Sequence, residues 1–183
     1  MSRCGMLGSM HPIETPRFRL IPATVRHVRA EIEDPSRFFE LLGVEPTAEW
    51  PSADLAEVLP LFLQQIEADE ANVGWVSWYW IDRTSLPHRL VGGGGFKGQP
   101  TSGGTVEIGY ETVPGHRRRG VATEAVGALV DWALRIDEVR LVIAETKMDN
   151  VASIGVLRRL GFRETGPGSE PGLLRFEQDK LAT

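Results

Sequence analysis

The sequence predicts a mixed α/β fold, and two observations carry that prediction. Residues 106–113 alternate between apolar and polar side chains, and a glycine-bearing loop separates them from residues 124–135, where apolar positions recur at helical spacing. A second apolar run over residues 139–145 follows that helix directly. A strand, a helix and a strand in this order form a crossover, so we expect the two strands to be parallel neighbours.

The rest of the chain supplies further strands and helices. Short apolar runs ended by Pro or Gly predict strands over residues 13–20, 73–82, 89–97, 162–165 and 173–177. Apolar stripes that begin at capping residues predict helices over residues 25–33, 35–42, 53–70 and 150–160. Pro60 lies inside the third of these helices and predicts a kink or a break there.

Composition restricts the classes of protein to consider. With 183 residues and 42% apolar residues, the chain is long enough for one packed domain, expected over residues 11–183 after a disordered leader over residues 1–10. The net charge of −5 argues against a nucleic-acid partner. Cys4 is the single cysteine, so we expect no disulfide and no metal site. No apolar run is long enough to span a membrane or to act as a secretory signal, which predicts a cytoplasmic protein, monomeric or homodimeric.

The loop after residues 106–113 has the features of a phosphate site. It contains Arg117, Arg118, Arg119 and Gly120, and a helix follows. The first turn of a helix has unpaired N–H donors and carries a partial positive charge. Gly120 lacks a Cβ, so an anion can approach the backbone closely. A solvated arginine loop is the simpler alternative, but it leaves the glycine and the helix start unexplained.

Several motifs together resemble the GNAT superfamily of N-acetyltransferases. Arg117-x-x-Gly120-x-Ala122 is similar to the loop with which that family binds acyl-coenzyme A, and Pro114 precedes it as the family often has it. Downstream, Asn150-x-x-Ser153 and the segment 160–162 resemble the second family signature. Upstream, residues 15–20 resemble the first strand of the ribosomal-protein N-terminal (RimJ/RimL-like) branch.

The resemblance implies a fold, a reaction and a set of binding residues. The fold is a twisted, mostly antiparallel sheet of about six or seven strands with helices on both faces. The reaction is acetyl transfer from acetyl-CoA, as co-substrate, to a primary amine that is either small or the N-terminus of a protein. The residues that it implies for CoA are Thr112, Val113, Arg117, Arg118, Arg119, Gly120, Val121, Ala122, Thr123 and Asn150.

Acetyl transfer to an amine needs a base for the ammonium proton and an acid for the thiolate. Glu107 matches an acidic position that the family often uses as the base, and Glu111 lies on the same strand face but nearer the loop. A salt-bridged structural carboxylate is an equal alternative for Glu107. Many relatives use a tyrosine as the acid, and Leu157 occupies that position here. Ser153 is the nearest hydroxyl, and an ordinary role at a helix start remains open for it.

Other interpretations were weighed against this one. Gly93-x-Gly95-x-x-Gly98 matches a dinucleotide fingerprint, but a hairpin loop follows where that motif requires a helix. We therefore expect the glycines to allow another backbone or a ligand close to the sheet. The tryptophans of residues 73–82 indicate core packing more than an acceptor wall. Because the usual tyrosine is missing, a non-catalytic acyl-CoA-binding or sensing domain on the same fold is the alternative function.

Overall fold

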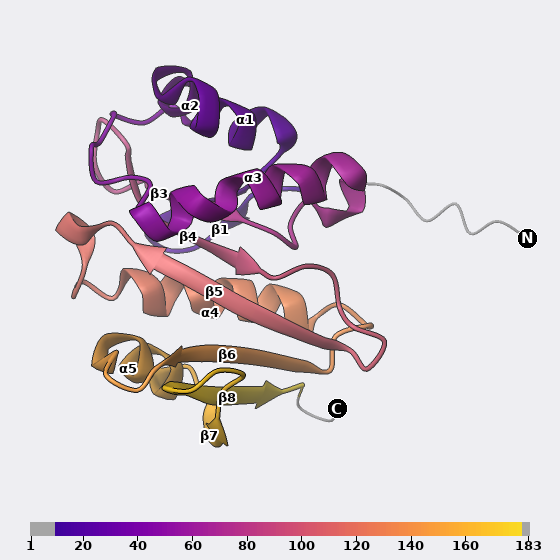
Figure 1. Cartoon of the computed structure of the whole chain (residues 1–183). Coiled ribbons are helices and arrows are strands. Elements are labelled where there is room, and N and C mark those ends of the chain that lie inside the picture. The colour runs from indigo at the N-terminus through magenta and orange to yellow at the C-terminus, as the bar shows by residue number, and fades with distance from the viewer. Residues whose placement is uncertain (1–9, 181–183) are drawn as a thin grey trace, which may run out of the picture.

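The computed structural model describes residues 10–180, which form one eight-stranded sheet flanked by helices (Figure 1). The strand order is β1-β2-β3-β4-β5-β6-β8-β7, and every neighbouring pair except β5 and β6 is antiparallel. The strands are β1 (Ile13–Glu14), β2 (Phe18–Pro22), β3 (Trp78–Asp82), β4 (Arg89–Phe96), β5 (Thr105–Thr112), β6 (Leu141–Lys147), β7 (Arg163–Pro167) and β8 (Leu173–Asp179). The predicted mixed, mostly antiparallel sheet is confirmed, with one strand more than the upper expectation.

Helices cover both faces of the sheet, and each face has its own apolar core. They are α1 (Val25–Glu33), α2 (Pro35–Leu42), α3 (Ala53–Ala68), α4 (Val121–Leu134) and α5 (Val151–Arg159). One core cluster joins α4 and α5 to the face that bears Trp78 and Trp80, and the other joins α1, α2 and α3 to the face that bears Tyr79. Figure 1 shows α3 in front of the sheet and α4 behind it.

The crossover through α4 makes β5 and β6 parallel, as the sequence predicts. They pair only over a short stretch, from Thr105 opposite Leu141 to Glu107 opposite Ile143. Beyond that point the strands separate, and Figure 1 shows the gap widening toward their carboxyl ends. We call the unpaired stretch between β5 residues 108–112 and β6 residues 144–147 the splay.

Three details differ from the sequence-based expectation. The first predicted strand is two short strands, β1 and β2, because the chain turns back around Pro16 and pairs Ile13 with Leu20. Trp75 precedes β3 and packs with Trp78 in one core cluster, because the strand alternation begins only at Trp78. α3 continues through Pro60 without a break. Pro60 lies on the exposed side of the helix, where water can reach the carbonyl that loses its N–H partner.

The tryptophans of β3 are core residues, as expected. Trp78 and Trp80 are fully buried on one face and Tyr79 on the other, so both faces of β3 are covered. The glycines of β4 allow a tryptophan ring and a neighbouring backbone to pack close to the sheet, as the sequence analysis expects. A Cβ on Gly93 would come 2.7 Å from the Trp50 ring, and one on Gly95 would come 2.2 Å from the Val76 carbonyl oxygen.

Most of the predicted leader, residues 1–9, lies outside the described residues. Met10 is described and packs against the core cluster beneath α4. Between residues 10 and 180, no helix has both the length and the apolar character needed to cross a bilayer.

Candidate active site

The splay exposes a ladder of backbone groups on β5. Lys97 donates its N–H to the Glu107 carbonyl and Val113 donates to the Val91 carbonyl, so odd-numbered β5 residues direct their backbone groups toward β4. By the alternation of a strand, Ile108, Tyr110 and Thr112 direct theirs into the splay. An extended chain of amides, such as a pantetheine arm, could pair there as an added strand.

This alternation corrects one expected rung. Both backbone groups of Val113 are engaged, since its N–H bonds to Val91 and its carbonyl accepts from His116 at 2.8 Å. Thr112 keeps its place in the splay, although its carbonyl also accepts from Arg117 Nε at 3.1 Å. Val113 therefore has no free backbone group for an added strand, whereas Ile108, Tyr110 and Thr112 direct theirs into the splay.

The loop at the end of β5 presents a row of backbone donors that could hold an anion. Within the described residues, the N–H groups of residues 118–123 donate to no backbone or side-chain acceptor. Gly120 is the N-cap of α4 with φ 72°, and Arg118 also has a positive φ of 62°. These backbone angles turn successive N–H groups toward one side, as in an anion-binding nest. The loop residues from Arg118 to Thr123 that were expected to bind CoA contribute to this row of donors, whereas the Arg117 N–H donates to the Pro114 carbonyl at 3.2 Å.

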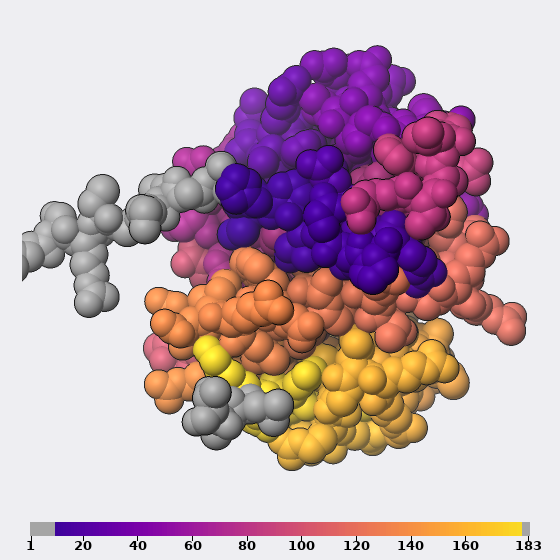
Figure 2. Space-filling model, turned by 180° about the vertical axis from the view of Figure 1, so that it is seen from behind, coloured from indigo at the N-terminus to yellow at the C-terminus, as the bar shows by residue number. Residues whose placement is uncertain are grey.

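Two residues of the N-terminal segment brace the loop, which sequence reasoning did not assign to the site. Arg17 donates from Nη1 to the Arg119 carbonyl at 2.9 Å and from Nε to Glu124 at 2.7 Å. Thr15 donates its hydroxyl to the same carboxylate at 2.6 Å. Burial raises the pKa of Glu124, but the hydrogen bonds and charge of these partners outweigh it and lower the pKa overall. Figure 2 shows the indigo N-terminal segment directly against the orange α4 region.

The face of the sheet opposite α4 carries carboxylates beside the splay. Glu107 on β5 is half-buried, and Lys97 Nζ lies 2.5 Å from its carboxylate. Glu145 on β6 also senses the charge of Lys97, but hydrogen bonds from Ser169 are the main cause that lowers its pKa. Glu107 therefore lies on the side from which an acceptor could approach β5, which its expected role as a base requires. It is also salt-bridged to Lys97, which the structural alternative predicts.

A pocket of about 380 Å³ lies between α3 and the floor formed by β4 and β5. Its floor includes Gly94, Gly109, Tyr110 and Glu111. The Ser52 hydroxyl donates to Glu111 and also accepts from the Leu55 N–H at 3.1 Å, so one residue caps α3 and ties it to β5. The pocket shares β5 with the splay, which brings an occupant of the pocket next to a thioester laid along that strand.

One wall of this pocket is held by a buried acid. Glu31 of α1 is 5% exposed and accepts from Trp50 Nε1 at 2.7 Å and from the Tyr79 hydroxyl at 2.6 Å. Burial is the largest influence on Glu31 and raises its pKa to about 7, against the two hydrogen bonds that favour its charged form. Trp50 lines the pocket, so this network fixes the orientation of a pocket wall.

Two hydroxyl groups, those of Tyr110 and Ser153, lie close together at the splay, and the sequence analysis did not predict this pair. The Tyr110 hydroxyl lies 2.9 Å from Ser153 Oγ, joining β5 to the first turn of α5 across the splay. Leu157, at the position of the usual tyrosine, is fully buried in the core and offers no proton. The sequence contains two tyrosines, and this small number could have directed attention to both as proton donors. The structure bonds Tyr79 to Glu31, which leaves Tyr110.

Asn150 begins α5 as the sequence predicts. Its side-chain oxygen accepts from the Ser153 N–H at 3.1 Å and so caps the helix. The cap fixes the turn that carries Ser153 at the edge of the splay. The side-chain amide of Asn150 forms no hydrogen bond with any residue between 10 and 180, so it could donate to a ligand.

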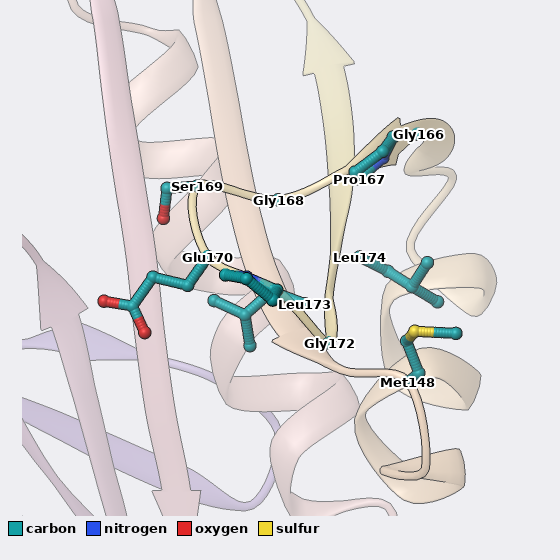
Figure 3. A pocket seen from close by; sticks show the side chains of 10 residues that line it. Met148, Gly166, Pro167, Gly168, Ser169, Glu170, Gly172, Leu173 and Leu174 are labelled. Atoms are coloured by element: carbon teal, nitrogen blue, oxygen red, sulfur yellow. The ribbon is translucent and has the colours of Figure 1, made fainter.

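A second hollow, of about 540 Å³, is formed by the β7–β8 loop (Figure 3). Ser169 and Glu170 lie on one side of it, and Met148 and Leu174 lie on the other. Ser169 holds this loop on β6 through hydrogen bonds to Glu145. Within residues 10–180, no three His, Cys, Asp or Glu side chains gather as a metal site requires.

Comparisons with known proteins agree with this geometry. Residues 23–163 match the family model described as an acetyltransferase (GNAT) domain. The uncharacterized N-acetyltransferase YjdG of Bacillus subtilis is 33% identical over 150 residues, covering 82% of this chain and 88% of that protein. Two solved structures share the fold at a TM-score of 0.63 and 92% coverage of this chain. They are the ribosomal-protein-S5-alanine acetyltransferase of Vibrio fischeri, 15% identical over 96% of its chain, and RimL, a ribosomal L7/L12 acetyltransferase in complex with coenzyme A, 17% identical over 98%.

Proposed function

Because the chain belongs to the GNAT family of N-acetyltransferases, we propose that it transfers an acetyl group from acetyl-CoA to a primary amine by direct attack in a ternary complex. The observation that carries the proposal is the splay between β5 and β6, which ends at the N–H groups of residues 118–123, six donors with no acceptor among residues 10–180. A long chain of amides with a phosphate at its far end fits this combination. The neighbouring pocket gives the acceptor a place on the same strand.

The donor side is assigned to backbone groups first and to arginines second. Residues 118–123 would hold the pyrophosphate, because helix N-termini and nests favour anions. Arg118 and Arg119 are exposed and form no ion pair within residues 10–180, so their charge is available to a phosphate. Thr112 and Tyr110 would pair with the amides of the pantetheine arm, and Asn150 would donate to it from the opposite side.

On the acceptor side, Glu107 is assigned as the base that removes the ammonium proton. The neutral amine can then attack the thioester carbonyl, forming the C–N bond as the C–S bond breaks. The ion pair with Lys97 fixes the position of the Glu107 carboxylate before a substrate binds. Glu111 lines the pocket and can take the proton through a water when Glu107 is removed.

Ser153 is assigned to the leaving sulfur, with Tyr110 behind it. The thiolate takes a proton from the Ser153 hydroxyl, and Tyr110, at 2.9 Å, can donate in turn to the serine oxygen. Burial raises the pKa of Tyr110, so it keeps its proton at neutral pH and remains a donor. The ammonium loses two protons in all. One leaves through the base, and the second, released from the nitrogen as the amide forms, replaces the proton that Ser153 and Tyr110 pass to the thiolate, so the net reaction releases one proton.

Thiol release tests the proposal. The full chain is mixed with acetyl-CoA and a broad set of primary amines, and CoA affinity is measured by calorimetry on the same preparation. We expect CoA to bind and thiol release to depend on an amine. Binding of CoA without release for any amine would instead support a sensing domain. A loss of release in Ser153→Ala that Tyr110→Phe reproduces and the double variant does not deepen would support the shared proton path.

A further inference from the structure

We infer that the acceptor is a primary amine whose ammonium is attached to an apolar body, rather than a polyamine or a hydrophilic amine. The inference rests on the proposed function and names the class of substrate that the pocket between α3 and β4–β5 fits. Its volume of about 380 Å³ lies in the range of small-molecule sites, about 300–1,000 Å³.

The walls of the pocket are mostly apolar. They come from the loop before α3 and from α3 itself, and they are Trp50, Leu55, Val58, Leu61 and Phe62. Val58 and Leu61 both line the pocket and are 38% and 51% exposed. Contiguous exposed apolar surface at a hollow is typical of a binding site. An apolar body of the acceptor would cover these two side chains.

The charges of the pocket favour one positive group. Glu111 and Asp54 line it, and its only charged lining residue of opposite sign among those described is Lys97, which is already paired with Glu107. An ammonium at the β5 end would therefore meet carboxylates, while a carboxylate-bearing acceptor would be repelled. Because Glu111 lies on β5 and Asp54 lies in the first turn of α3, the ammonium is expected between that turn and β5, and the apolar body under the rest of α3.

The pocket is also pre-formed. Trp50 is anchored through Nε1 to the buried Glu31, and its ring lies so close to Gly93 that a Cβ there would come within 2.7 Å. Ser52 ties the start of α3 to Glu111. A wall fixed by hydrogen bonds on both sides costs little ordering on binding, so it can select an acceptor by shape.

Matched acceptors test the inference. Phenethylamine and hexylamine are compared with ethanolamine and putrescine, and peptide amides that begin with Phe or Leu are compared with those that begin with Ser or Asp. We expect kcat/KM for the apolar members to be at least about ten-fold higher, as burial of one small apolar group gives. A preference in the small-amine arm or in the peptide arm supports the inference and identifies the source of the acceptor.

Variants of α3 locate the preference. Val58→Ser and Leu61→Ser remove apolar surface from exposed positions, so folding should be unaffected. We expect the double variant to raise KM for the apolar amine about five- to ten-fold, while KM for acetyl-CoA stays unchanged. Leu86→Ser is the matched control, because Leu86 is 84% exposed in the turn between β3 and β4 and lines no part of the pocket.

Two outcomes would overturn the inference, and they differ from failure of the reaction itself. Equal or better turnover of hydrophilic amines would overturn the acceptor class and leave the acetyltransferase proposal standing. A preference for apolar amines that survives Val58→Ser with Leu61→Ser would overturn the place assigned to it. Intact CoA binding without turnover of any amine would overturn the proposed function and this inference together.

Discussion

The two substrate sides that we propose, a donor side for acetyl-CoA and an acceptor side for the amine, are built in different ways. The donor side consists of backbone groups of β5 and of the loop before α4, all within residues 108–123, with Asn150 and Ser153 added from the start of α5. The acceptor side consists of side chains that come from α1, the loop before α3, α3, β3, β4 and β5. Glu31 and Trp50 are nineteen residues apart, and Ser52 and Glu111 are fifty-nine apart.

This difference explains how much the amino-acid sequence of each side can change without loss of its ligand. Backbone N–H groups are the same for every sequence, so the donor side needs only the right turns, which Gly120 and the end of β5 supply. The acceptor side needs particular side chains in register, and each substitution there changes its shape. A family can therefore keep one co-substrate while its acceptors differ. The following predictions test this division, and each pairs a change on one side with a control.

The largest effect is expected at Glu107, the proposed base. Glu107→Gln removes the base and should lower kcat about 10²–10⁴-fold, with little change in KM for acetyl-CoA. The loss should shrink as the pH rises, because more of the amine arrives neutral. Steady-state kinetics between pH 6 and about pH 9 give both results, in keeping with general-base behaviour.

Glu111 could partly replace Glu107 as the base and so make the loss in the single variant smaller. If Glu111 takes the proton through a water, the single variant falls short of the range and Glu107→Gln with Glu111→Gln reaches it. Glu45→Gln, an exposed carboxylate paired with Arg89, is the control and should leave kcat unchanged. Near-normal turnover of the double variant at neutral pH would make Glu107 a structural residue.

The features that could be predicted from the sequence belong mostly to the donor side, and those that could not belong mostly to the acceptor side. The α4 crossover, the parallel pair and the loop of residues 117–123 were predictable because each depends on a local pattern of glycine, apolar spacing and helix start. α1 and α2 were predicted at their observed bounds because Pro35 and Gly43 are strong local signals. The Glu31–Trp50–Tyr79 network was not predictable, because nothing in a sequence places a buried acid beside two aromatic donors from distant segments.

The second prediction concerns the stability of the acceptor side. Burial raises the pKa of Glu31 from its ordinary value of 4.5 to about 7, so the folded protein holds this proton more tightly than the unfolded chain. Stability from this group is therefore full below about pH 4.5 and is lost as the pH rises through about 7, by about 3 kcal/mol. Urea unfolding at acidic and at mildly alkaline pH should show the loss in the wild type and not in Glu31→Gln. An equal pH dependence in both proteins would contradict the assignment.

The third prediction tests whether backbone groups dominate the donor side. A valine at Gly120 would strain a left-handed residue by about 1–2 kcal/mol and bring its Cβ to 3.4 Å from Nη2 of Arg17, which braces the loop. We expect CoA binding to weaken at least about ten-fold, as 1.4 kcal/mol corresponds to ten-fold in Kd. Arg118→Gln should weaken it less than about five-fold, because an exposed charge contributes about 0–1 kcal/mol.

Gly43 provides the matched control for this comparison. It ends α2 with φ 68°, so Gly43→Val introduces a similar backbone strain away from the loop. Both glycine variants should lose stability, but calorimetry should find a changed Kd for CoA only in Gly120→Val. An unchanged Kd in Gly120→Val would mean that the donor loop is misplaced.

The smallest effect is expected at Ser52, which joins the cap of α3 to the pocket floor. Ser52→Ala removes the acceptor for the Leu55 N–H and should lower the free energy of unfolding by about 1 kcal/mol. It also releases Glu111, so KM for the amine should rise by a few-fold while KM for acetyl-CoA does not move. Asp34→Ala is the matched control, because Asp34 caps α2 through the Arg37 N–H at 3.1 Å and lies outside the pocket. Asp34→Ala should lower the free energy of unfolding by a similar amount and leave both KM values unchanged.

The comparison of the two cap variants separates two causes. If both variants raise the amine KM equally, general loosening of the helices is the cause. If only Ser52→Ala does so, the contact between Ser52 and Glu111 sets the position of α3 over the acceptor, and that side of the molecule depends on single side chains where the donor side does not.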